Sequence, residues 1–106
     1  MPKYLYTANY TPEGVKGLVR DGGTGRRAAV EKAVAGAGGR LEAMYFAFGG
    51  NDVYVICDMP NNAAAAAMAL AVNASGLAAS NTVVLMTAAE VDEATKKSIE
   101  YRPPGG

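Results

Sequence analysis

From Met59 through Ala89 the chain carries no charged side chain, a stretch of 31 residues. Surface helices of monomeric proteins normally keep charged residues on their solvent side. A membrane span does not explain the stretch, because a span needs about 20 consecutive apolar residues and the longest run, Ala63 to Val72, has ten. The smooth alanine surface of that run favours contact with another copy of the chain. An exposed helix, alanine-rich only for its helix propensity, is the alternative.

Composition narrows the classes of function. The chain has 106 residues, enough for one domain over residues 1–106. Ten Lys and Arg balance ten Asp and Glu, which argues against nucleic acid as a partner, because binding it needs a clustered basic excess. Histidine is absent and Cys57 is the only cysteine. We therefore expect no metal site, and the commonest general base is missing. We also expect no cofactor and, without the apolar run of a signal peptide, a cytoplasmic location.

Periodicity and capping residues predict the order β-α-β-β-α-β, followed by a short helix and an extended tail. The first helix is expected in two pieces broken at Gly22-Gly23, and the hairpin is expected to close through a tight turn of positive-φ residues at Gly49–Asp52. With right-handed crossovers this order gives an α+β, ferredoxin-like fold, in which both main helices cover one face of an antiparallel sheet. The predicted strands are Lys3–Tyr10, Arg40–Phe48, Asp52–Met59 and Thr82–Met86; the helices start near Thr11, Thr24, Asn61 and Thr87; the tail is Ile99–Gly106.

Two of these strands are apolar on both faces. In Asp52–Met59 and in Thr82–Met86, large apolar side chains occupy odd and even positions alike. Such strands are typically covered on both sides, yet the helices of one chain cover only one side of a ferredoxin-like sheet. We therefore expect the chain to associate with itself, as a dimer or a larger oligomer.

Motifs along nearly the whole chain resemble those of the GYD-domain family. They are the start KYLYTANYTPEG, the helix GGTGRRAAVEK, the hairpin LEAMYFAFGGNDVYVI, the helix end ALAVNASG and the capping box TAAE. The resemblance implies a dimeric α/β-barrel form of the ferredoxin-like fold, a class that includes enzymes acting on small aromatic or polyketide-like substrates. The family is named for a Gly-Tyr-Asp turn, and the matching positions here are Gly50, Asn51 and Asp52, so asparagine replaces the tyrosine.

Tyrosines and one carboxylate are the main candidates for a ligand site. Tyr6 and Tyr10 fall on one face of the first strand, and Tyr45 and Tyr54 lie on the neighbouring hairpin. Around a cavity they would offer flat apolar walls with polar tips to a small aromatic or planar ligand; in a core or an interface they would serve structure alone. Asp52, after the hairpin turn, is either a base or ligand anchor or the acceptor that holds the turn.

Other candidates have equally open interpretations. Asn9 precedes Tyr10 at the end of the first strand, and Asn73 interrupts an apolar helix, where it points into a cavity or bonds across an interface. The turn Gly22–Arg27 could hold an anion, although a helix break with solvated arginines is favoured. Cys57 is expected to be buried and inert. The segment Tyr101–Pro104 is either a docking arm or a frayed terminus.

These observations lead to two expected functions. The first is a homo-oligomeric small-molecule-binding protein, or a cofactor-free enzyme, with a tyrosine-lined pocket. In an enzyme, Asp52, Tyr10 and Tyr54 would be the catalytic candidates. The second is a structural or regulatory oligomerisation module with no chemistry.

Overall fold

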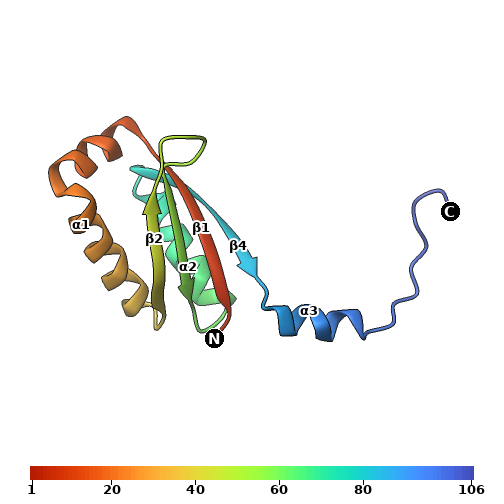
Figure 1. Ribbon diagram of the computed structural model, residues 1–106. Coiled ribbons are helices and arrows are strands. Elements are labelled where there is room, and N and C mark those ends of the chain that lie inside the picture. Colours follow the sequence, from red (N-terminus) through yellow and green to blue (C-terminus); the bar gives the residue numbers. More distant parts are fainter.

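The computed structural model describes all 106 residues and has the predicted α+β, ferredoxin-like order of elements. Four antiparallel strands form one sheet in the order β2-β3-β1-β4, with β3 and β1 in the centre (Figure 1). The strands are β1 (Lys3–Tyr10), β2 (Arg40–Phe46), β3 (Val53–Asp58) and β4 (Ala78–Leu85), and the helices are α1 (Pro12–Gly36), α2 (Asn62–Ala74) and α3 (Ala88–Thr95). The fold class predicted from the sequence is confirmed.

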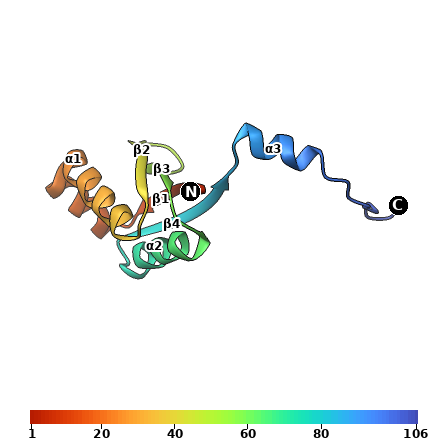
Figure 2. The ribbon, with the colours of Figure 1, turned by 90° about the horizontal axis from the view of Figure 1, so that it is seen from below.

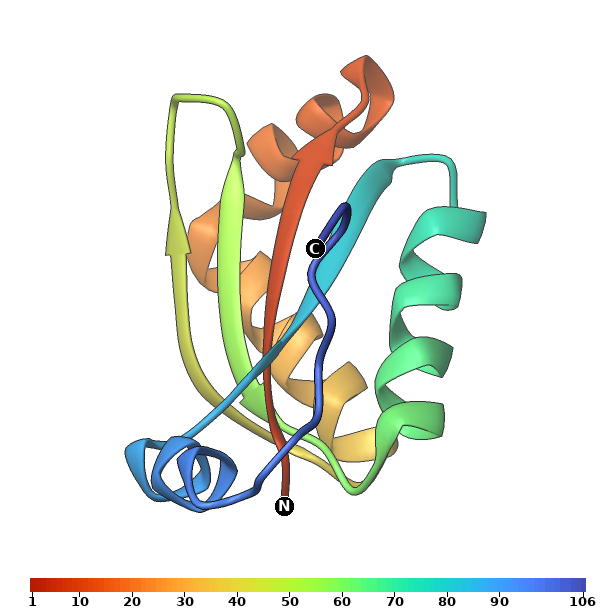
Figure 3. The same ribbon diagram turned by 90° about the vertical axis from the view of Figure 1, so that its right-hand side faces the viewer.

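The helices α1 and α2 lie on the same face of the sheet (Figures 2 and 3). Most of the contacts of α1 are with β2, and those of α2 are with β4, so the central strands run between the two helices. Both helices start where the sequence predicts a cap: the Thr11 side chain accepts a hydrogen bond from the Gly14 amide, and the Asn61 side chain accepts one from the Ala64 amide. None of the three helices is both long enough and apolar enough to cross a membrane.

A kink divides α1 into two pieces at the predicted place, but the predicted start near Thr24 is wrong, because the second piece resumes at Gly23. Gly22 has φ +73° and ψ 168°, outside the helical region, and the helix continues on both sides of it. Glycine adopts this positive φ without the steric penalty that a side chain would bring. After the kink, Arg26 and Val30 line the space between α1 and the sheet.

The connection between β2 and β3 is wider than predicted, and the expected tight turn is wrong. Neither Gly49 nor Gly50 has a positive φ. The loop is closed by a hydrogen bond of 2.8 Å from the Ala47 amide to the Asp52 carbonyl, and the Asp52 amide donates to the Ala8 carbonyl of β1 at 2.9 Å. Attachment to β1, rather than local turn chemistry, therefore fixes where β3 begins.

The strand β4 starts at Ala78, earlier than the predicted start at Thr82. Its first residues, Ala78 to Asn81, have weak strand preference. They are nevertheless paired with the end of the central strand, from Tyr10 opposite Ala78 to Thr7 opposite Asn81. Pairing along the full length of β1 thus outweighs local preference in this segment.

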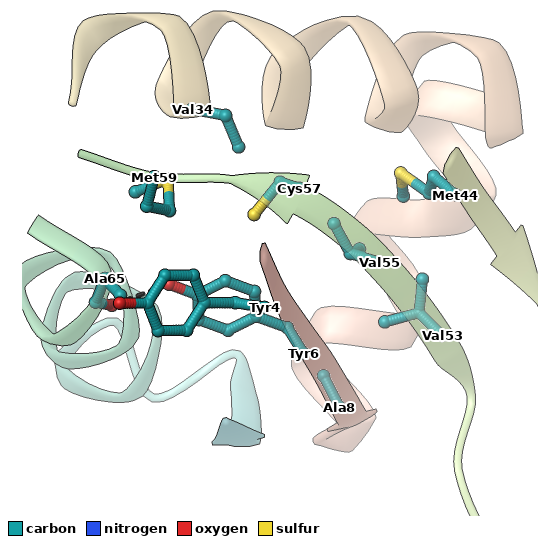
Figure 4. Close-up of a cluster of buried hydrophobic side chains, with 10 residues drawn as sticks. All are labelled: Tyr4, Tyr6, Ala8, Val34, Met44, Val53, Val55, Cys57, Met59 and Ala65. Atoms are coloured by element: carbon teal, nitrogen blue, oxygen red, sulfur yellow. Dashed lines mark hydrogen bonds between the residues drawn. The ribbon is translucent and has the colours of Figure 1, made fainter. Parts of the chain in front are cut away.

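The core lies between the sheet and the two helices (Figure 4). Tyr4 and Tyr6 point from β1 toward α2, where the Tyr4 hydroxyl donates to the Asn62 side chain at 2.5 Å and the Tyr6 hydroxyl donates to the Ala65 carbonyl at 2.6 Å. Both phenols are therefore buried with their hydrogen bonds satisfied. The buried hydrophobic residues are Tyr4, Tyr6, Ala8, Val34, Met44, Val53, Val55, Cys57, Met59 and Ala65.

The last part of the chain projects away from the domain. After β4, the predicted capping box is present, with Thr87 and Glu90 bonded reciprocally at the start of α3. The helix α3 and the tail that follows extend beyond the edge of the sheet (Figure 1). The radius of gyration is consequently 16.8 Å, against about 13 Å for a compact chain of this length. We call residues 86–106 the C-terminal arm.

Candidate functional site

A small hollow lies between the helical face of the sheet and the two main helices. Its volume is about 60 Å³, and ten of its twelve lining residues are hydrophobic. We call it the inner pocket. The residues that matter most below are Tyr6 and Tyr10 of β1, Arg26 and Val30 of α1, and Met68 and Val72 of α2.

A wider and more polar cleft adjoins the inner pocket. Its volume is about 360 Å³, within the range of small-molecule sites, about 300–1,000 Å³. We call it the outer cleft. The exposed residues Arg20 and Asp21 line the outer cleft but not the inner pocket. The cleft shares four residues with the inner pocket, namely Tyr10, Arg26, Val72 and Ala78. The two hollows therefore adjoin along these four residues, one with an apolar lining and the other with a more polar lining.

The two tyrosines of this site have different roles. Tyr6 is buried, and its hydroxyl already donates to the Ala65 carbonyl. Burial raises the pKa of Tyr6 to about 12, which keeps the phenol neutral and makes it a wall of the pocket. Tyr10 lies four residues further along β1 on the same face and is half-buried. Its hydroxyl has no hydrogen-bond partner in the chain, unlike the hydroxyls of Tyr4 and Tyr6. Tyr10 is therefore free to contact a bound molecule.

Arg26 lines both hollows, and sequence reasoning did not assign it to a pocket. Its Nε is buried and has no hydrogen-bond partner, and the guanidinium forms no ion pair. An unpartnered buried donor is unusual, because leaving one unsatisfied costs about 1–3 kcal/mol. The signal in the sequence was the turn Gly22–Arg27, which brings a kink directly before this arginine.

A family model for the GYD domain matches residues 4–95 of the chain. The chain belongs to the GYD-domain family. The match includes all three helices and all four strands except the first residue of β1, which agrees with the resemblance in the sequence motifs. No curated protein and no solved structure gives a significant match.

In this GYD domain, Asp52 and Asn9 hold the backbone beside the site. The Asp52 carboxylate accepts a hydrogen bond of 2.9 Å from the Tyr10 amide, and the Asn9 side chain accepts one of 3.1 Å from the Asp52 amide. These bonds tie the start of β3 to the end of β1, whereas the sequence alternative placed the Asp52 acceptor within the hairpin turn itself. Asp52 lines neither the inner pocket nor the outer cleft. It borders a third surface depression with Phe46 and Phe48, and that depression shares Tyr10 with both hollows.

Asn73 ties α2 to β4 and does not line the pocket. Its side-chain oxygen accepts hydrogen bonds from the Ser80 amide at 2.7 Å and from the Ser80 hydroxyl at 3.2 Å. The side-chain oxygen of Asn73 is therefore occupied within the chain. Ser80 does line the inner pocket, but its hydroxyl donates to Asn73.

Tyr45 and Tyr54 lie on the opposite face of the sheet from Tyr6 and Tyr10. They pair with each other across β2 and β3, while Val55, next to Tyr54, points toward the helices and is buried. The structure thus divides the candidate tyrosines between two faces and does not bring them into one cavity.

The face that carries Tyr45 and Tyr54 is not covered by any helix (Figure 2). Tyr45 is 71 % exposed, Tyr54 38 % and Val83 47 %. We call this surface the open face. It consists of the outward side chains of the strands, chiefly Leu5, Thr7, Tyr45, Tyr54, Ile56 and Val83.

A cluster of charges borders the open face at one end. Asp58 accepts hydrogen bonds from Lys3 at 2.8 Å and from Arg40 at 3.2 Å, and Lys3 also pairs with Glu42. The hydrogen bond from Lys3, with a further one from Arg40, lowers the pKa of the Asp58 carboxyl against the opposing effect of desolvation. Asp58 is therefore ionised at neutral pH, and its two ion pairs connect the end of β3 to the starts of β1 and β2.

Proposed function

We propose that this GYD domain is a self-associating protein that binds a small, flat, largely apolar molecule in the inner pocket and outer cleft. The observation that carries the proposal is the shared lining of the two hollows: the apolar inner pocket and the more polar outer cleft both border Tyr10 and Arg26. Ligand sites generally combine apolar walls with a few unpaired polar groups in this way. Flat side chains such as Tyr10 also favour a planar ligand.

The side chains around the site favour binding over catalysis. The chain has no histidine, the carboxylate of Asp52 is engaged by a backbone amide, and burial raises the pKa of the Cys57 thiol to about 11. The three catalytic candidates are also not convergent, because Tyr54 lies on the far face of the sheet from Tyr10. A poised general acid or base needs a position within hydrogen-bond reach of the reacting group.

Self-association is supported by the open face. Tyr45, Tyr54 and Val83, which belong to β2, β3 and β4, are exposed there, and the same chain offers no helix to cover them. Exposed apolar surface of this kind marks interaction sites in soluble proteins. A second copy of the chain, packing its own open face against this one, would bury both surfaces at once.

A thermal-shift screen with flat aromatic compounds tests the ligand part of the proposal. A compound present at 100 times its Kd should stabilise the fold by about 2.7 kcal/mol. We expect Val72→Trp, which fills the boundary of both hollows, to abolish the shift. Ala67→Trp is the matched control, because Ala67 is an exposed residue of the same helix outside the site.

A second candidate function, an oligomerisation module without a ligand, is favoured by the open face alone. It predicts that the chain associates, that no compound shifts the melting temperature, and that Val72→Trp leaves association unchanged. Shifts that survive in Val72→Trp would remove the pocket from the proposal.

A further inference from the structure

We infer that Arg26 makes the site selective for an anionic ligand, a planar apolar body that carries a carboxylate; this inference rests on the proposed function. The guanidinium lines both the inner pocket and the outer cleft. A carboxylate beside it would lie where the two hollows meet, and the hydrocarbon part would lie against the apolar side chains that line both of them.

The polar groups of the inner pocket point to the chemistry of the missing partner. The polar groups in the lining are the side chains of Arg26 and Ser80 and the hydroxyls of two of the hydrophobic residues, Tyr6 and Tyr10. The hydroxyls of Tyr6 and Ser80 donate to acceptors within the chain. The remaining groups are the phenol of Tyr10 and the guanidinium of Arg26. A guanidinium can only donate hydrogen bonds, so the group that completes the site must accept them.

Charge favours an anion over a neutral acceptor. Lys3, Lys16 and Arg40 form the ion pairs of the chain, whereas Arg26 forms none. The outer cleft contains two arginines, Arg20 and Arg26, against the single carboxylate of Asp21. A planar guanidinium matches a carboxylate through two parallel N–H···O bonds, and the ionised pair is roughly twice as strong as a neutral hydrogen bond.

The apolar lining separates an organic carboxylate from a free inorganic anion. Val30, Met68 and Val72 surround the space next to Arg26, and they offer no hydrogen bonds to the other oxygens of a phosphate ion. Burial of a flat hydrocarbon against these residues would add the hydrophobic contribution. The site therefore combines one charged contact with an apolar surface.

Calorimetric titration with three probes tests the inference: 2-naphthoate, its neutral analogue 2-naphthamide, and inorganic phosphate. We expect the full chain to bind naphthoate roughly tenfold to a hundredfold more tightly than naphthamide, the range of a charge-assisted hydrogen bond. Phosphate should not compete at millimolar concentration. Arg26→Gln should bind both naphthalene compounds with equal affinity, and the control Arg27→Gln, at an exposed neighbour outside the site, should behave like the wild type.

The outcomes separate this inference from the proposed function. Equal binding of naphthoate and naphthamide by the wild type would overturn the anion selectivity and leave the pocket in place. If Arg27→Gln removed the preference as fully as Arg26→Gln, general surface charge would be responsible and the assignment to Arg26 would fail. If neither compound bound, both proposals would fail.

A stability measurement guards against misfolding of the variant. Because Arg26 makes no hydrogen bond or ion pair within the chain, Arg26→Met should melt at the same temperature as the wild type or above it. The same variant should lose the preference for naphthoate. A lower melting temperature for Arg26→Met would show that the guanidinium supports the fold, and would contradict a role reserved for a ligand.

Discussion

At the scale of single residues, the alternation along β1 decides which side chain serves which surface. Tyr4, Tyr6 and Ala8 are buried under the helices, and the residues between them belong to the open face. The sequence pattern predicted this division, because aromatic residues at every second position indicate a strand. The sequence pattern could not show which side chains of the β2–β3 hairpin face the helices. That depends on the pairing register and on the bulge between Leu41 and Ala43.

Cys57 should be chemically inert in the folded protein. Its side chain is fully buried, and burial raises its pKa to about 11, with a further contribution from the negative charge of Asp58. At pH 8 the thiolate fraction should therefore be about a hundredfold smaller than for an exposed cysteine. Reaction with a disulfide reagent should proceed only as fast as the protein unfolds. Cys57→Ala combined with Ala67→Cys is the exposed control, and equally prompt reaction of the wild type would contradict the burial.

Asp58 should make the stability of the fold depend on pH in the acidic range. Its folded pKa is lowered, so its contribution is fully present above the unfolded value, about 3.9, and is lost as the pH falls through the folded value. Asp58→Asn should therefore melt a few degrees below the wild type at pH 7, and the difference should shrink below pH 4. Asp92→Asn, on the exposed helix α3, is the matched control and should melt at the same temperature as the wild type at pH 7.

At the scale of elements, local signals predicted the beginnings of helices well. Thr11, Asn61 and Thr87 cap their helices as expected, because a cap involves only neighbours in sequence. The start of β4 and the width of the β2–β3 loop were missed, since both depend on hydrogen bonds to β1. Arg26 was missed as a pocket residue for a related reason: the direction of the helix after the Gly22 kink follows from packing and not from periodicity.

Two glycines of α1 should respond oppositely to alanine. A methyl group at Gly14 would overlap the carbonyl oxygen of Leu77, which also accepts the amide of Thr11. Gly14→Ala should therefore destabilise the fold by about 1–3 kcal/mol. A methyl group at Gly17 meets nothing within 4 Å, so Gly17→Ala should stabilise the helix by about 0.5–1 kcal/mol. Urea denaturation of both variants measures this, and a loss of stability in Gly17→Ala would contradict the open surroundings.

At the scale of the whole molecule, apolar area exceeds what one chain can bury. The core has ten hydrophobic residues, while the open face, the outer side of α2 and the C-terminal arm leave large side chains exposed, among them Tyr45, Leu70 and Ile99. The uncharged stretch in the sequence predicted this excess. Which surface a partner covers is a three-dimensional property, because it requires both the sheet order and the side on which the helices lie.

Tyr54→Glu should separate the subunits. We expect the wild type to sediment at a multiple of the chain mass of 10.9 kDa, and the variant to sediment as single chains, because an unpaired carboxylate would have to be buried in the apolar interface. Tyr101→Glu, in the C-terminal arm and away from the open face, is the matched control. A wild type that sediments as a single chain at micromolar concentration would refute self-association through this surface.

The position of β1 at the centre of the sheet has a consequence for how the two surfaces communicate. Tyr6, Ala8 and Tyr10 line the inner pocket and the side chains between them lie toward the proposed partner copy, but both sets share one backbone. A bound molecule that shifts this ribbon by a fraction of an ångström would move both sides together. Thermodynamic reciprocity then requires that, if occupancy alters how strongly two copies adhere, diluting the protein must alter its affinity for the molecule by the same factor.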